Sequence, residues 1–129
     1  CIDSTQWEGH AMAGLEARSF DSPDETRTPP NTRVDVVKLG GVTAARLTLQ
    51  PGWRWSEAVK PTAGTDSCQA LHVGAVISGQ LHVKHEDGTE GDVHAGDAYV
   101  AEPGHDAWVV GDMPVVALEF SSAESYAKG

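Results

Sequence analysis

From residue 33 onward, the sequence consists of short runs rich in β-branched residues, divided by glycine-containing turns. Such runs at close intervals are typical of a β-sandwich or a β-barrel. Asp87-Gly88 is the sharpest turn signal, because this pair favours a two-residue hairpin. No helix of ordinary length fits between the runs, which excludes an alternation of strands and helices. The sequence therefore predicts an all-β fold.

Alternation within the runs indicates which side chains share a face. Leu81 and Val83 lie on one side of their predicted strand, and His82 lies on the other. The predicted strands cover residues 33–39, 42–50, 71–78, 80–85, 97–102, 106–110 and 115–120.

A chain of 129 residues is long enough for one domain and one core. We predict an irregular N-terminal arm over residues 1–32, a barrel over 33–121 and a C-terminal tail over 122–129. Within the arm, the run from Ser22 to Glu25 has the form of a helix start, with serine as the cap and proline in the first turn. The arm could also add a strand to a neighbouring barrel, so a homodimer is expected.

The chain is acidic, with Lys+Arg 9 against Asp+Glu 19 and a formal net charge of -10. This charge disfavours binding to nucleic acids and to anionic membrane surfaces. No apolar stretch approaches the roughly 20 residues that a membrane-spanning helix needs.

The two cysteines, Cys1 and Cys68, do not make a disulfide framework, which favours a cytoplasmic protein. A start at Cys1 is also compatible with a processed chain, a lipoprotein acylated at Cys1 or a truncated reading frame, and Met12 could equally be the true start.

Two segments resemble the sequence motifs of the cupin superfamily. The first covers residues 71–83, and the second covers residues 95–108, with the Asp87-Gly88 hairpin between them. The resemblance extends over roughly residues 42 to 120. It implies a double-stranded β-helix, or jelly-roll barrel, whose interior holds a small ligand.

The resemblance also implies metal-ligand positions, with departures from the family pattern. With Gly79 as the closing glycine of the first motif, the usual glutamate is replaced by His72. The usual pair of histidines is then replaced by Asp66 and Cys68. In the second motif the usual histidine falls at about Ala107, whereas a histidine stands two residues earlier, at 105.

Residues two apart on a strand share a face, so His105 is expected to point inward with the others. Together with Asp66, Cys68 and His72 it would form a set of donors suited to a divalent metal ion. A thiolate with imidazoles and a carboxylate favours zinc first, with iron, copper or nickel as alternatives. The alternative interpretation is structural: Cys68 is a buried apolar side chain, His72 makes one hydrogen bond in the core, and Asp66 belongs to a turn.

Aromatic residues near these donors are expected to line or cap the ligand pocket. They are Trp53, Trp55, Tyr99 and Trp108. Three further histidines, at 82, 85 and 94, are expected on the solvated surface. Arg54 and Lys60 are expected there too, although both could neutralise an anionic substrate.

These features point to a small-molecule-binding cupin, either a metal-dependent enzyme or a non-catalytic binding or sensing module. No paired carboxylates and no nucleophile beside a base identify a reaction in the sequence. An oxygenase, an isomerase and a lyase are equally compatible, because one fold supports many chemistries.

Overall fold

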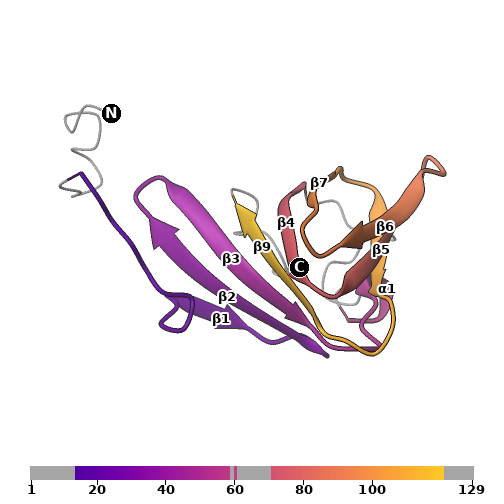
Figure 1. Cartoon of the computed structure of the whole chain (residues 1–129), viewed down its shortest axis with the longest axis horizontal. Helices are drawn as coiled ribbons and strands as arrows, with labels where there is room; N and C mark the ends of the chain where they lie inside the picture. The colour runs from indigo at the N-terminus through magenta and orange to yellow at the C-terminus, as the bar shows by residue number, and fades with distance from the viewer. Residues whose placement is uncertain (1–13, 59, 61–70, 121–129) are drawn as a thin grey trace.

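The structure, a computed structural model, describes residues 14–58, 60 and 71–120. In that part of the chain, nearly all regular structure is antiparallel β-sheet (Figure 1). The strands are β1 (Glu25–Arg27), β2 (Thr32–Leu39), β3 (Val42–Leu49), β4 (His72–Ser78), β5 (Gln80–His85), β6 (Glu90–His94), β7 (Ala98–Ala101), β8 (His105–Val109) and β9 (Val115–Phe120), and one short helix, α1, covers Trp55–Ala58.

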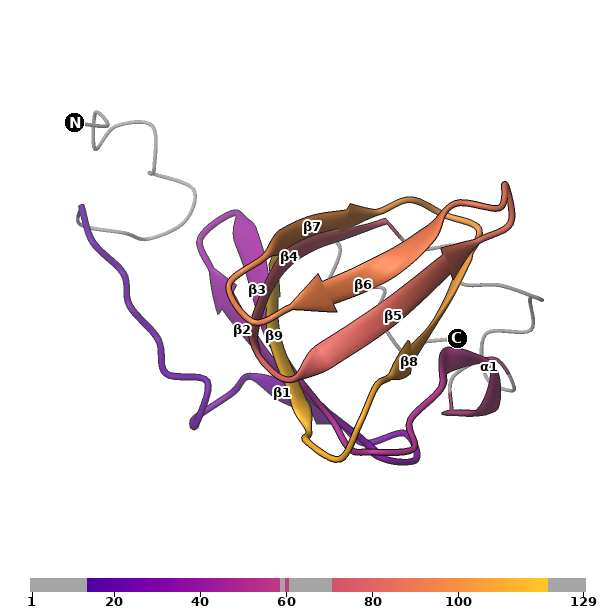
Figure 2. The same cartoon turned by 45° about the vertical axis from the view of Figure 1, so that its right-hand side comes forward.

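The strands form a 6-stranded sheet in the order β1-β2-β3-β9-β4-β7 and a 3-stranded sheet in the order β6-β5-β8. Figure 2 shows the smaller sheet facing strands β9, β4 and β7 of the larger one, so that the two sheets enclose a barrel. From β6 to β9 consecutive strands alternate between the smaller and the larger sheet, as in a double-stranded β-helix. The predicted all-β jelly-roll class is therefore confirmed.

The core lies between the two sheets and is built from one face of each strand. On β9, Val115 and Ala117 are buried and point inward, and on β3 Leu47 and Leu49 do the same. Leu81 on β5 joins the same apolar cluster, as the alternation in the sequence predicts. A continuous apolar interior of this kind supplies most of the stability of a small β-barrel.

Two parts of the chain differ from the sequence-based expectation. The run from Ser22 to Glu25 does not start a helix: Glu25–Arg27 form β1, which pairs with β2 of the same chain. The reason lies in Asp24, which would stand in the first helical turn but whose Oδ2 accepts a hydrogen bond from the Lys38 backbone N–H of β2 at 2.8 Å. Its own N–H donates to the Val36 carbonyl at 2.8 Å, which continues the ladder along the β2 edge.

Strand β6, over Glu90–His94, was not predicted because its residues lack a β-branched run. It pairs with β5 across the Asp87-Gly88 hairpin, and Val93 is its one side chain packed against the core in the described residues. No described helix is long and apolar enough to cross a membrane.

Candidate functional site

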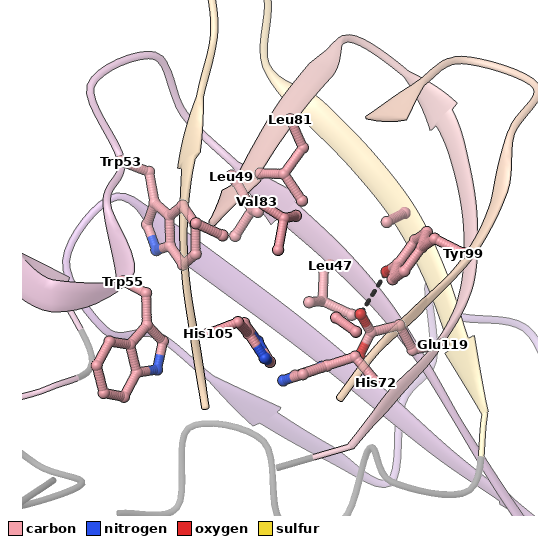
Figure 3. Close-up of a pocket in the computed structure, with 13 residues that line it drawn as sticks. Leu47, Leu49, Trp53, Trp55, His72, Leu81, Val83, Tyr99, His105 and Glu119 are labelled. Carbon is pink, nitrogen blue, oxygen red and sulfur yellow. Dashed lines mark hydrogen bonds and ion pairs between the residues drawn. The ribbon is translucent and has the colours of Figure 1, made fainter. Parts of the chain in front are cut away.

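Two buried histidines meet inside the barrel. His72, the first residue of β4, is 4% exposed, and His105, the first residue of β8, is 5% exposed. Their ring centroids lie 5.1 Å apart with the ring planes at 76°. Figure 3 shows the two rings pointing toward each other across the cavity. The fold thus brings together two of the donors that the sequence singled out, from opposite sheets.

Each of these rings has its Nδ1 atom engaged by the protein. The Nδ1 of His72 lies 2.7 Å from Oε1 of Glu119, and that of His105 lies 2.7 Å from the carbonyl oxygen of Glu102. Because a carbonyl or carboxylate oxygen accepts, Nδ1 carries the proton in both rings. When such a ring is neutral its lone pair is on Nε2, and the hydrogen bonds fix the ring orientations.

Glu119 lies at the centre of a chain of hydrogen bonds. This carboxylate is 3% exposed and points inward from β9. One oxygen accepts from His72, and the hydroxyl of Tyr99 donates to the other, as the dashed line in Figure 3 marks. Glu119 was not among the predicted site residues, although a glutamate at an inward position between apolar neighbours was a signal. The buried carboxylate therefore fixes the orientation of the His72 ring.

Apolar side chains surround these polar groups. Trp53 and Trp55 close one side of the cavity, and Leu47, Leu49, Leu81 and Val83 form its walls (Figure 3). Tyr99 lines the cavity as well. The free volume is about 30 Å³, room for about one or two water molecules. The interior therefore has space for an ion or a water molecule but not for a whole metabolite.

Trp108 was predicted to line the interior, and this is corrected by the structure. On β8 the inward residues are His105, Ala107 and Val109, so Trp108 points to the opposite face. There its ring stacks on His82 at 4.7 Å, and the guanidinium of Arg54 lies over it at 4.1 Å. Strand alternation alone required this outcome once His105 was assigned inward.

The three other histidines among the described residues lie outside the cavity. His82 is on the outer face as predicted, although its side chain is only 19% exposed, because it stacks on Trp108 and contacts Glu90 and Asp92. His85 and His94 flank turns and contact Asp87 and Asp97 respectively.

Asp66 and Cys68 lie outside the described residues, so their ligation remains a prediction. Within the described ranges, no group of three or more His, Cys, Asp or Glu residues is arranged to hold a metal ion. The described site is thus a pair of imidazoles with their supporting hydrogen bonds.

A second hollow of about 520 Å³ opens beside the cavity. It shares Val83, Tyr99, Ala101 and His105 with the inner cavity, and the turn that carries His85 and Asp87 forms part of its rim. A volume of this size is in the range that small-molecule sites occupy. His105, although buried, therefore also lines a hollow of the size of small-molecule sites.

The turn at the rim of the outer hollow contains His85, a histidine whose pKa is shifted. The Nε2 of His85 donates to the carbonyl oxygen of Pro103 at 2.8 Å. This hydrogen bond raises the pKa of His85, and the Asp87 carboxylate adds to the shift, against partial desolvation.

A raised pKa in the folded state means that His85 protonation favours folding. The stabilisation is complete below the ordinary histidine pKa of about 6.5 and is lost as the pH rises through the folded-state value. We expect the stability difference between the wild type and His85→Gln to shrink as the pH rises, measured by urea unfolding between about pH 5 and 8.5. Asp87→Asn, which leaves the Pro103 hydrogen bond in place, should retain most of the dependence. An equal difference at all pH values would contradict the prediction.

This chain is similar to known proteins in its structure, not in family profile or curated sequence. No protein-family profile matches the sequence, and no curated protein matches it either. Among solved structures, KdgF from Halomonas sp. is 21% identical, with 76% of this chain and 87% of that chain covered and a TM-score of 0.53. A protein with a double-stranded β-helix domain from Klebsiella pneumoniae is 20% identical, with 85% and 86% covered and a TM-score of 0.54.

A protein of unknown function from Rhizobium leguminosarum is 17% identical, with 84% of this chain and 97% of that chain covered and a TM-score of 0.60. At such identities the similarity concerns the fold alone. The two facing antiparallel sheets, the order of their strands and these structural neighbours agree: this chain has the double-stranded β-helix fold of the cupin superfamily.

Proposed function

We propose that this protein is a small-molecule-binding cupin that uses a divalent metal ion held by His72 and His105. The observation that carries the proposal is the orientation of the two imidazoles. Both are buried, both have Nδ1 bonded to a fixed acceptor, and they face one another across an apolar cavity. Metal-ligating histidines in proteins have this pattern, in which the other ring nitrogen donates to a carboxylate or a carbonyl.

The donor chemistry of the described residues fits such an ion. Neutral imidazole nitrogens bind zinc, iron, copper and nickel, whereas magnesium and calcium prefer oxygen donors. Two imidazoles do not complete a coordination shell, so further donors are needed. Asp66 and Cys68 remain the proposed additional ligands. When bound, a metal ion of this class acts as a Lewis acid on an oxygen or nitrogen of the ligand.

The substrate or ligand would bind in the outer hollow. The inner cavity has about 30 Å³ of free space and the outer one about 520 Å³, with His105 and Tyr99 lining both. A metabolite in the outer hollow could thus present one polar group to the inner cavity. His72, held by Glu119, and the hydroxyl of Tyr99 are the polar groups that would orient it.

A non-catalytic binding or sensing role is the second candidate. The small free volume beside the histidine pair favours it, because a closed metal site leaves no position for a substrate. The coordination number of the bound metal separates the two roles. An open position that an added small ligand occupies supports an enzyme, and a shell of four protein donors supports binding alone.

The test of the metal site is the metal content of the purified protein. We expect one equivalent of a transition metal in the wild type, and a loss of affinity of at least about 10 to 100-fold in His72→Ala, His105→Ala and Cys68→Ala. His94→Ala, which removes a surface histidine, is the matched control. Elemental analysis and competition with a chromophoric chelator give both quantities. Wild-type protein that binds no metal after reconstitution, or variants that bind it equally well, would overturn the proposal.

A further inference from the structure

The larger sheet has an outer face on which strands β4, β7 and β9 carry mainly apolar side chains; the register shift after Val76 also places Ser78 beside Val116. Alternation assigns these residues to the side opposite the cavity, and the register places them beside one another: Val73 pairs with Val100, and Ala75 with Leu118. We name this surface the outer apolar face. It consists of Val73, Ala75, Ile77, Ala98, Val100, Val116, Leu118 and Phe120.

Several of these side chains are exposed to a degree that is unusual for apolar residues side by side. Val100 is 62% exposed, Ile77 54%, Phe120 44% and Val73 38%. An antiparallel sheet normally presents polar residues on its solvated side, so a sheet that is apolar on both faces is normally covered on both. Contiguous apolar surface marks an interaction site.

The other half of the same face is built differently. On β2 and β3, Asp35 is fully buried between Arg33 at 2.9 Å and Arg46 at 3.1 Å. The N-terminal arm covers this half, since the ring of Phe20 lies 5.7 Å from the Arg46 guanidinium and Asp21 forms an ion pair with it. The described part of the arm therefore covers β2 and β3 with charged and aromatic contacts, whereas the outer apolar face keeps its exposure.

The distribution of charge on the chain indicates that the partner on this face is a second copy. The chain has a net charge of -10, so two copies repel each other over most of their surfaces. The outer apolar face contains no charged residue, and two copies that meet there bring no like charges together. A flat, uncharged sheet face is also complementary to itself under a twofold rotation, which is the commonest symmetry of oligomers.

The size of the face fits the centre of such an interface. Three strands about 4.8 Å apart, with about six residues of 3.3 Å each, span roughly 300 Å². Stable dimers bury roughly 800 Å² per partner, with an apolar centre and a polar rim. The exposed Leu71 and Met113 stand next to β4 and β9 and can extend the contact. The area therefore indicates a dimer that dissociates on dilution rather than a permanent one.

We propose that the chain forms a twofold dimer by packing the outer apolar face against the same face of a second copy. This proposal is independent of the metal site, because the face lies on the opposite side of the sheet from the cavity. It assigns dimer formation to the sheet face rather than to strand exchange by the arm.

Sedimentation equilibrium over a range of concentrations tests the proposal. The wild type should approach twice the chain mass of 13.6 kDa as concentration rises into the upper micromolar range. Val100→Asp and Ile77→Asp each place a charge within the apolar contact of both copies and should remain monomeric. Leu15→Asp, which changes an apolar residue that is 85% exposed but lies off the sheet, is the matched control and should dimerise normally.

Circular dichroism and metal content should be the same in all variants, which separates loss of the dimer from loss of the fold or of the metal site. A wild-type chain that is monomeric at every concentration would overturn the proposal, because the face would then have another occupant. A dimer that persists in both Val100→Asp and Ile77→Asp would also overturn it, since another surface would carry the contact.

Discussion

Gly74→Ala is expected to destabilise the protein by at least about 3 kcal/mol, near the upper end for overpacking of a core. A Cβ atom at this position would lie 2.1 Å from the carbonyl oxygen of Leu118 and 2.9 Å from Cγ of Glu119. The first of these atoms is backbone, so β4 and β9 must separate before the methyl group fits. The variant should unfold at a clearly lower urea concentration than the wild type.

The same substitution should weaken metal binding. Gly74 lies directly opposite Glu119 in the β4–β9 pairing, so the absence of a side chain makes room for the carboxylate that holds His72. Gly91→Ala is the matched control, because a Cβ on that β6 residue meets nothing within 4 Å. We expect its stability to change by no more than about 1 kcal/mol. Equal stabilities for Gly74→Ala and the wild type would show that the strands separate at little cost.

Some of this geometry could be predicted from the sequence, and Gly74 shows where the prediction ends. A glycine inside a strand indicates a bulge or a close approach of backbone. The sequence does not say which strand approaches, because β9 is distant in the chain and its register with β4 depends on the whole sheet. The close contact with Leu118 and Glu119 thus appears only in three dimensions.

The inward orientation of His72 and His105 followed from a resemblance and from strand alternation. The same alternation, applied consistently, would have placed Trp108 outside and Glu119 inside, since parity along β8 and β9 fixes both. The error at Trp108 arose from treating an aromatic residue near the motif as a pocket wall, although an outward tryptophan can be covered by neighbouring side chains. Arg54 and His82 cover it here.

Strand β6 and the first strand were missed for a different reason. Glu90–His94 contains two acidic residues and a glycine, a composition with low strand propensity. Its strand conformation comes from pairing with β5 across a tight hairpin, which is a tertiary effect. In the same way, the edge of β2 recruits Asp24 and the residues after it, which by themselves favour a helix start.

Glu119→Gln is expected to lower the metal affinity of the protein by about 10 to 100-fold, the range for residues that support a metal ligand. The amide keeps the size of the side chain and can still accept a hydrogen bond from His72. It removes the negative charge beside His72, and its NH₂ group cannot accept a hydrogen bond from the Tyr99 hydroxyl. The fold should remain intact, because no cavity is created.

The chain offers a matched control on its outer surface. Glu90 also contacts a histidine, with its Oε1 atom 3.3 Å from Nε2 of His82, but this pair lies outside the barrel. Glu90→Gln should leave metal affinity unchanged in a competition titration. Tyr99→Phe should produce a smaller loss than Glu119→Gln, since it keeps the carboxylate on His72. If both glutamate variants bind metal as tightly as the wild type, the Glu119 carboxylate serves packing alone and His72 is not the ligand that we infer.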